Sequence, residues 1–266
     1  MAPPTSRYID RLSDKRVLII GGSSGIGYAV AEGALEHDAI VTIAGSNPSK
    51  LKRAMASLQT SYPTQTANNR LRSMCCNLSD TSMLDTNLVQ LLKLAADDGK
   101  INHVVYTAAE MTQPPLLADL TAEVVQKFGM IRFVAPLILA KHLPVYMDRK
   151  KENSLTLTSG AHTHKPDPGW TVVTGYCGAV EAAMKGLAVD LKPLRVNVVS
   201  PGAVLTTVVR DILGDAFEEG IKAAAEKSTV GAVGNPEEVA QAYLYLMKDS
   251  YVSGTVLESN GGMMLM

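Results

Sequence analysis

Short, almost wholly apolar segments recur along the chain, with longer amphipathic segments between them. Segments this short and apolar are typical of parallel strands buried on both faces, and such strands need helical crossovers. The alternation predicts an α/β fold over residues 1–266: one doubly wound domain with a seven-stranded parallel sheet and helices on both faces. The predicted strands are Arg16–Ile20, Ile40–Ala44, Leu71–Cys75, His103–Tyr106, Ser154–Thr158, Arg195–Val199 and Thr255–Glu258. The predicted helices include Gly25–His37, Met83–Ala96, Ala122–Leu143, Ala179–Leu191 and Pro236–Met247.

Composition narrows the class of protein. The chain has 266 residues, 46% of them hydrophobic, and a net charge of −1 with scattered basic residues. This balance favours a large core and argues against nucleic-acid or membrane partners. The first fifteen residues lack the apolar segment of a secretory signal, and no uninterrupted apolar run approaches the ~20 residues of a membrane span. Three cysteines fit no metal-ligand spacing, so we expect a cytoplasmic protein without a metal site.

A glycine-rich turn, Gly21-Gly22-Ser23-Ser24-Gly25-Ile26-Gly27, follows the first predicted strand directly. Glycines let the backbone turn tightly and approach a pyrophosphate, while the helix that begins there offers N–H groups and the positive end of its dipole. A strand, this turn and a helix in that order predict the dinucleotide-binding site of a Rossmann fold. The predicted cofactor contacts in this turn are Gly21, Ser23, Ser24, Gly25, Ile26 and Gly27.

The end of the second strand predicts which dinucleotide is bound. The chain reads Ala44-Gly45-Ser46-Asn47-Pro48-Ser49-Lys50 and has no carboxylate there. A carboxylate would bind the ribose 2′-hydroxyl of NAD and repel a 2′-phosphate. We therefore predict NADPH, with Ser46, Asn47 and Lys50 at its 2′-phosphate. The alternative, that Lys50 and Arg53 only solvate a helix face, stays open at this point.

The Gly-x-x-x-Gly-x-Gly spacing resembles that of the short-chain dehydrogenase/reductase family, and the resemblance runs over almost the whole chain. Asn77-Leu78 lies where the family places an Asp–hydrophobic pair against adenine, and residues 197–202 resemble its N-x-V-x-P-G strand end. Residues 253–254 and 261–262 resemble its C-terminal signature. The resemblance implies a homotetramer built through the long fourth and fifth helices. It also implies further cofactor contacts from Asn77, Leu78, Ala108, Pro201, Gly202, Val204 and Thr206.

The family's catalytic Tyr-x-x-x-Lys pair is missing. The segment Val180–Leu191 matches the family's helix without a gap, and counting back places Val173 at the Tyr position and Cys177 at the Lys position. Tyr176 is about 300° round the helix from Val173, so we expect it to be a packing residue or a pocket wall rather than a general acid. Ser159 keeps a serine at the end of the fifth strand, but without the tyrosine we expect that it cannot run the family's usual proton relay. The catalytic Asn of the fourth helix is replaced by Arg132.

The loss of the Tyr/Lys pair changes which electrophile the site can reduce. A carbonyl that accepts hydride becomes an alkoxide and needs a proton, whereas an iminium carbon is already cationic and needs hydride alone. The site therefore favours an iminium, and a nearby anion would stabilise the positive charge of this cation. The loop after the fifth strand supplies Asp167 between two prolines, followed by the only tryptophan, Trp170. A plain surface turn is the alternative for this Pro-Asp-Pro sequence.

Arg132, Asp167 and Trp170, without the Tyr/Lys pair, resemble the fungal NADPH-dependent reductases that double as intramolecular Diels–Alderases in bicyclo[2.2.2]diazaoctane indole alkaloid biosynthesis. The resemblance implies an indole alkaloid precursor as substrate. It assigns Asp167 to the iminium, Arg132 to the amide oxygens and Trp170 to aromatic packing. A reductase of another secondary metabolite and a non-catalytic dinucleotide-binding protein remain alternatives. Residues 206–230 are predicted to be either a mobile substrate lid or an ordinary helix pair.

Overall fold

The computed structural model describes residues 8–67, 69–109 and 113–266. Within these residues, seven parallel strands form one sheet in the order β3-β2-β1-β4-β5-β6-β7. The predicted fold class is confirmed, and the predicted strands agree with the observed ones to within two residues at each end. The strands are β1 (Arg16–Ile20), β2 (Ile40–Gly45), β3 (Leu71–Cys75), β4 (His103–Tyr106), β5 (Ser154–Thr158), β6 (Arg195–Pro201) and β7 (Val256–Ser259).

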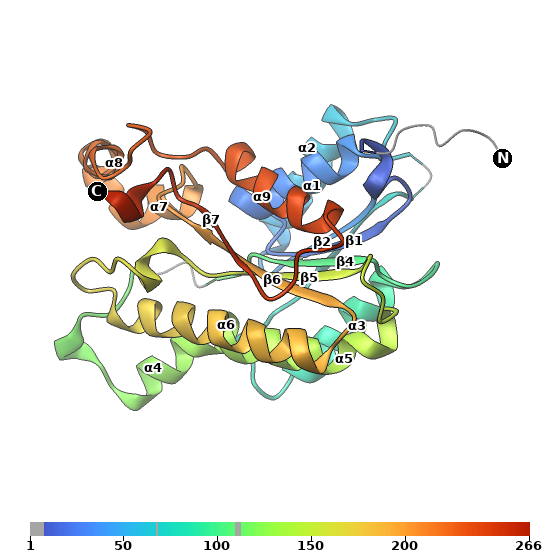
Figure 1. Ribbon diagram of the computed structural model, residues 1–266, viewed down its shortest axis with the longest axis horizontal. Helices are drawn as coiled ribbons and strands as arrows, with labels where there is room; N and C mark the ends of the chain where they lie inside the picture. The colour runs from blue at the N-terminus through green and yellow to red at the C-terminus, as the bar shows by residue number, and fades with distance from the viewer. Residues whose placement is uncertain (1–7, 68, 110–112) are drawn as a thin grey trace.

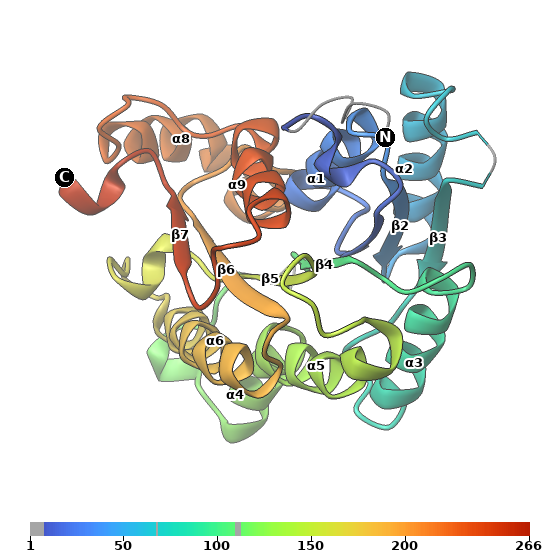
Figure 2. The same ribbon diagram turned by 45° about the vertical axis from the view of Figure 1, so that its right-hand side comes forward.

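Helices cover both faces of the sheet (Figures 1 and 2). One face carries α1 (Gly25–Glu36), α2 (Pro48–Ser61) and α9 (Pro236–Lys248). The other carries α3 (Leu84–Ala95), α4 (Ala122–Gly129), α5 (Ala135–Tyr146) and α6 (Thr171–Asp190). The alternation of side chains along a strand gives each face its own core: Val17 and Ile19 of β1 pack on the first face, Leu18 and Ile20 on the second.

The strand order reverses direction between β1 and β4, which are neighbours in the sheet although β2 and β3 separate them in sequence. The connections from these two strands therefore leave toward opposite faces. A crevice forms at such a switch point, outside the carboxyl ends of the strands. The turn after Ile20 and the segment after Tyr106 lie side by side at this crevice, because the two residues are register partners.

The predicted long helix from Ala122 is interrupted at a functional position. A π-helical turn, Met130–Val134, joins α4 to α5. The Tyr106 hydroxyl donates a hydrogen bond to the Ile131 carbonyl at 2.6 Å and thereby gives a carbonyl of this turn a partner outside the helix. Arg132 lies in the middle of the turn. The sequence prediction treated 122–143 as one continuous helix and did not locate this interruption.

The residues predicted to form a lid or a helix pair form a helix pair, α7 (Thr207–Leu213) and α8 (Phe217–Glu226). Thr206 caps α7 by accepting a hydrogen bond from the Val209 N–H at 3.3 Å. In Figure 1, α7 and α8 lie at the same end of the molecule as the C-terminus. Short 3-10 turns span Asp10–Leu12, Leu117–Asp119, Ala161–Thr163, Gly214–Ala216 and Met263–Leu265.

Two helical stretches are long and apolar enough, by length and composition alone, to cross a membrane: 122–146, with mean hydropathy 1.4, and 171–190, with 1.2. The sequence predicted no membrane span because no uninterrupted apolar run is long enough; these two helices pass a different test, of helix length and mean hydropathy. Both stretches lie along one face of the sheet as its covering layer (Figure 1). The α6 helix also begins at Thr171, eight residues before the predicted start. The prediction missed this first part of the helix because Gly175 and Gly178 lower its helix propensity.

Candidate functional site

A groove of about 560 Å³ lies at the carboxyl edge of the sheet, where β1 and β4 diverge. Its size is typical of a small-molecule or cofactor site. It is lined by the glycine-rich turn, by the residues that follow β2, β3, β4 and β5, by the π-helical turn, and by the beginnings of α6 and α7. Of the sixteen predicted cofactor contacts, fourteen line this groove: Gly21, Ser23, Ser24, Gly25, Ile26, Gly27, Ser46, Asn47, Lys50, Asn77, Leu78, Ala108, Pro201 and Thr206.

The glycine-rich turn is shaped by close backbone contacts. Gly21 has φ +98°, and a Cβ atom on it would lie 2.6 Å from the Thr107 Oγ1. A Cβ atom on Gly27 would lie 2.4 Å from the Gly21 carbonyl oxygen. The N-cap residue of α1, Ser24, has an extended backbone and a side chain that makes no capping hydrogen bond to the described residues. The first N–H groups of α1 are therefore open to an anionic ligand, as a pyrophosphate site requires.

The end of β2 fits a 2′-phosphate. Asn47 begins α2 by accepting a hydrogen bond through Oδ1 from the Lys50 N–H at 2.9 Å, with Pro48 at the first helical position. Its side-chain amide nitrogen, the Ser46 hydroxyl and the Lys50 ammonium remain as donors in this part of the groove. No acidic residue is among the described residues that line the groove. A dianionic phosphate meets donors and a helix N-terminus here, and no opposing carboxylate.

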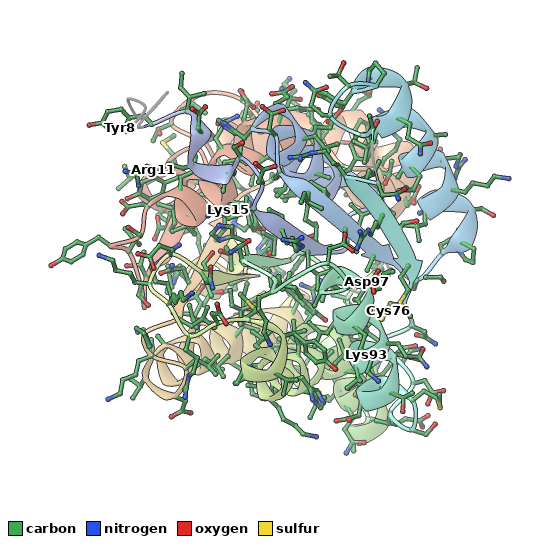
Figure 3. The ribbon with its side chains drawn as sticks, turned by 90° about the vertical axis from the view of Figure 1, so that its right-hand side faces the viewer. Tyr8, Arg11, Lys15, Cys76, Lys93 and Asp97 are labelled. Atoms are coloured by element: carbon green, nitrogen blue, oxygen red, sulfur yellow. The ribbon has the colours of Figure 1, made fainter. Side chains whose placement is uncertain are left out.

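The residues after β3 form the side wall of the groove. Cys76 lies at the end of β3, beside α3 (Figure 3), and Leu78 is buried. The Asn77 Oδ1 accepts hydrogen bonds from both the N–H and the hydroxyl of Ser79, at 3.0 and 2.8 Å, which fixes the turn. An apolar wall beside a rigid polar turn suits the adenine base.

Two predicted cofactor contacts, Gly202 and Val204, are not among the residues that line this groove and stay predictions. Gly202 packs against another loop, since a Cβ atom on it would lie 2.8 Å from the Asn260 Cα. Val204 is buried, and its backbone forms a bridge with Gly234. Both belong to the segment after β6, which turns away from the groove and returns to it only at Thr206. Sequence reasoning missed several lining residues, including Thr107 and Pro114, which only the β1–β4 neighbourhood brings to the site.

The positions of the missing catalytic pair are apolar and buried. Val173 is 4% exposed and lines the groove, and Cys177 is 3% exposed and packs beneath it with Phe128 and Val172. Tyr176 faces elsewhere: its hydroxyl donates to the Val125 carbonyl at 2.9 Å. The prediction that Tyr176 is a packing residue is confirmed by this contact.

The three predicted catalytic residues are placed differently from one another. Arg132 and Trp170 line the groove at the end that also holds Val173. The Asp167 carboxylate is not among the described lining residues; Oδ1 lies 2.8 Å from the Lys227 Nζ, and Oδ2 lies 3.8 Å from the His162 Nδ1. The His162 ring stacks on Trp170, with centroids 4.1 Å apart and planes at 19°. Asp167 thus reaches the groove wall through His162, and its role at the substrate stays a prediction.

His162 connects this carboxylate to the aromatic wall. Burial is the largest influence on its ring and lowers the pKa of His162, an effect that nearby Lys227 reinforces and Asp167 opposes. The ring is therefore mainly neutral near pH 7. A neutral imidazole stacked on an indole extends the aromatic surface on which a planar ligand can pack.

A buried carboxylate lies next to the groove and contacts it through Ser159. Ser159 lines the groove, and its hydroxyl donates to the Glu181 Oε1 at 2.7 Å. The Glu181 Oε2 lies 3.1 Å from the His164 Nε2. Sequence reasoning kept Ser159 but missed Glu181 and His164. No spacing signal joins these residues, because β5, the loop after it and the third turn of α6 meet only in the fold.

Comparison with known proteins identifies the fold family. A family model described as an SDR-like Rossmann domain matches residues 8–266. A relative named short-chain dehydrogenase/reductase malC, from Malbranchea aurantiaca, is 57% identical over 262 residues, which are 98% of this chain and 99% of the relative. The chain belongs to the short-chain dehydrogenase/reductase family.

Solved structures agree with this family assignment. The structure of the MalC reductase/Diels–Alderase from Malbranchea aurantiaca matches with a TM-score of 0.93 at 56% identity, and the match covers 97% of this chain and 100% of that one. A small-chain dehydrogenase in complex with NADPH matches with a TM-score of 0.75 at 26% identity, covering 96% of this chain and 100% of that one. The predicted resemblance to the short-chain reductases, and within them to the reductase/Diels–Alderase group, is confirmed.

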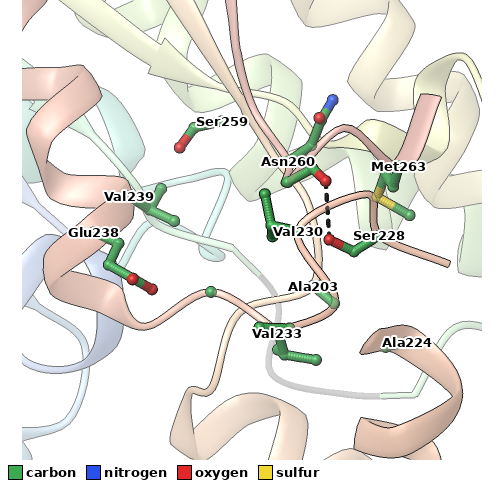
Figure 4. A pocket seen from close by; sticks show the side chains of 13 residues that line it. Ala203, Ala224, Ser228, Val230, Val233, Glu238, Val239, Ser259, Asn260 and Met263 are labelled. Carbon is green, nitrogen blue, oxygen red and sulfur yellow. Dashed lines mark hydrogen bonds between the residues drawn. The ribbon is translucent and has the colours of Figure 1, made fainter. Parts of the chain in front are cut away.

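A smaller cavity of about 190 Å³ lies between the ends of α8 and β7 and the start of α9 (Figure 4). Its one acidic lining residue, Glu238, accepts a hydrogen bond from the Asn235 N–H at 2.7 Å and so caps α9. Ser228 donates to the Gly261 carbonyl at 2.9 Å. These polar side chains therefore hold the start of α9 and the C-terminal segment in place.

No group of three His, Cys, Asp or Glu side chains in the described part of the chain is arranged to bind a metal ion. The large groove is the candidate active site of this short-chain reductase.

Proposed function

We propose that this protein reduces a cyclic iminium with NADPH and then directs an intramolecular [4+2] cycloaddition, in fungal indole alkaloid biosynthesis. The substrate class is a prenylated dipeptide aldehyde of the Trp–Pro type that cyclises to the iminium. One observation carries the proposal: the groove keeps the dinucleotide-binding turn while Val173 and Cys177 replace the Tyr/Lys pair and Arg132 and Trp170 line the same end. The 57% identity to malC and the name of its solved structure support it.

NADPH is the cofactor that the groove fits. The open N-terminus of α1 would hold the pyrophosphate, and Ser46, Asn47 and Lys50 would hold the 2′-phosphate. When bound, the cofactor supplies a hydride. The NADPH complex of the 26% identical dehydrogenase supports this assignment.

The protein's own residues orient the substrate. Arg132 enters the groove from a rigid π-helical turn, so its guanidinium is preorganised to donate hydrogen bonds to the amide oxygens. Trp170, backed by His162, offers a flat surface for the indole. Asp167 stabilises the iminium after exchanging its lysine partner for the substrate cation. The cycloaddition needs mainly shape and preorganisation, which an apolar wall such as Val173 provides.

The test uses the purified protein, NADPH and a prenylated Trp–Pro dipeptide aldehyde. We expect NADPH oxidation together with one stereoisomer of the cycloadduct. Asp167→Asn should slow both and weaken the stereocontrol, while Asp215→Asn, an exposed control between α7 and α8, should leave them unchanged. Turnover and stereochemistry unaffected by Asp167→Asn would remove the role assigned to Asp167. Wild-type protein that oxidises no NADPH would refute the function itself.

Two other functions predict different results in the same assay. A reductase of another secondary-metabolite carbonyl or imine would oxidise NADPH with simple ketones or quinones at useful rates but would form no cycloadduct from the dipeptide aldehyde. A non-catalytic dinucleotide-binding protein would bind NADPH without turning over any iminium or carbonyl. The family membership and the hydroxyl of Ser159 in the groove favour the first over the second.

Assembly and location complete the proposal. We place the protein in the cytoplasm as a homotetramer formed through α4–α5 and α6. Support comes from apolar side chains on these helices that the chain by itself does not cover: Val145 is 60% exposed and Val189 is 66% exposed. Light scattering of the purified protein should give the tetramer mass, and a monomer mass at working concentration would contradict this assembly.

A further inference from the structure

A continuous polar chain leads from the groove to solvent. It begins at Ser159, which lines the groove although the residue is only 7% exposed. It passes to Glu181, whose side chain is 9% exposed, at 2.7 Å, and from there to His164, whose side chain is 52% exposed, at 3.1 Å. Each of the three side chains can both give and accept a proton.

The buried carboxylate needs an explanation, because removing a charge from water is costly unless it is partnered. Glu181 satisfies this condition with one partner on each oxygen, Ser159 on Oε1 and His164 on Oε2. An apolar residue would fill the same space between α6 and the sheet without that cost. The two partners lie on opposite sides of it, one in the groove and the other toward solvent. The arrangement therefore connects two compartments that differ in their access to protons.

We infer that Ser159, Glu181 and His164 form a proton relay that replaces the missing Tyr/Lys pair and gives the groove a further activity, the reduction of aldehydes or ketones. This inference rests on the proposed function, since it uses the same groove and the same hydride donor. Ser159 is the catalytic residue that meets the substrate, while Glu181 and His164 act through it.

The proton moves in one direction during reduction. The His164 imidazolium gives its Nε2 proton to the Glu181 Oε2, and the carboxyl group turns about its Cγ–Cδ bond to present that proton to Ser159. Hydride addition forms a C–H bond and places the carbonyl π electrons on oxygen. The oxyanion takes the Ser159 hydroxyl proton, Glu181 restores the hydroxyl, and His164 takes a proton from water. The balance is one hydride and one proton from water per carbonyl reduced to an alcohol.

The first test measures NADPH oxidation with a simple aldehyde that cannot cyclise to an iminium, a simple ketone and a preformed cyclic iminium. Glu181→Gln keeps the shape and the hydrogen bonds but holds no transferable acid proton, so kcat for the carbonyl substrates should fall roughly 10- to 100-fold. The iminium rate and the NADPH dissociation constant should stay within about twofold, because an iminium needs no proton. His164→Ala should lower the same carbonyl rates, and added imidazole should restore them, because this end of the chain is open to solvent.

A matched control is His142→Ala. His142 also faces a carboxylate, with its Nε2 3.1 Å from the Asp85 Oδ1, but lies on α5 outside the groove. This variant should keep the carbonyl rates and show no response to imidazole. The second test needs no turnover: in the cofactor-free protein, the ¹⁵N signals of the His164 ring should shift in Ser159→Ala as well as in Glu181→Gln, because the chain couples them. Thermal melting of each variant checks that the fold is kept.

The outcomes separate the two claims. Carbonyl and iminium rates that respond equally to Glu181→Gln, or carbonyl rates within twofold of wild type, would refute the relay and leave the proposed function standing. The same holds if wild type reduces the iminium but no carbonyl. His164 ring signals that ignore Ser159→Ala would also refute the coupling. No NADPH oxidation by wild type with any of the three substrates would refute the proposed function, and the relay with it.

Discussion

The ion pair between Asp167 and Lys227 makes the proposed role of Asp167 testable. Lys227 follows α8, and its Nζ lies 2.8 Å from the Asp167 Oδ1. If Asp167 stabilises the substrate cation, the lysine and the substrate compete for one carboxylate. Replacing Lys227 by Met keeps most of the side-chain volume and removes the competitor. We therefore expect Lys227→Met to lower the KM for the cyclic iminium rather than raise it.

The size of the effect follows from exposure. The side chains of Lys227 and Asp167 are 49% and 40% exposed, so water and salt screen the pair. Half-exposed pairs of this kind contribute about 0.2–1 kcal/mol. Since 1.4 kcal/mol corresponds to a tenfold change, the KM should fall by a factor of about 1.5 to 5, and by less in high salt.

Steady-state assays of NADPH oxidation over a range of iminium concentrations measure this change. Lys222→Met removes the same charge from an exposed position on the same helix and should leave the KM unchanged. Asp167→Asn combined with Lys227→Met should show no gain over Asp167→Asn alone, because the carboxylate is then absent. A KM that rises in Lys227→Met would refute the competition and assign the ion pair to holding the loop in place.

The other predictions concern stability and can be measured by urea unfolding. Gly27→Ala should lower the free energy of unfolding by about 1–3 kcal/mol and weaken NADPH binding, because its Cβ atom would lie 2.4 Å from a backbone oxygen. Gly186→Ala, with nothing within 4 Å of the added Cβ atom, should raise the free energy of unfolding by about 0.5–1 kcal/mol. Burial above all, reinforced by nearby Arg195 and Lys15, lowers the pKa of His103 to about 3. Only the unfolded chain then takes up this proton, so stability should fall by up to about 4–5 kcal/mol between pH 6.5 and 3, less steeply in His103→Asn. Tyr176→Phe should lose about 1 kcal/mol with its hydrogen bond to α4 and keep its activity; a large loss of activity would contradict the packing role.

The sequence by itself determined the fold and the cofactor end of the groove. Short, mostly apolar segments that alternate with amphipathic ones are typical of strands covered on both faces, so the sequence predicted a parallel sheet of seven strands. The glycine-rich turn and the residues after β2 are contiguous in sequence, and short segments hold their own geometry. For that reason all nine cofactor contacts predicted from these two segments line the groove. Gly202 and Val204 do not line it, because the direction of a loop depends on what it packs against.

Tertiary structure alone determined the side-chain contacts at the reactive end of the groove. Sequence register showed that the tyrosine and lysine are absent, which leaves no proton donor at the tyrosine's position. Only the packing of α6 on β5 brings Glu181 within 2.7 Å of Ser159, and only the path of the following loop brings His164 to the other oxygen. The position of α8 brings Lys227 to Asp167, sixty residues away. Such contacts leave no local pattern, because hydrogen bonds between side chains depend on ångström-scale placement of elements that are distant in sequence.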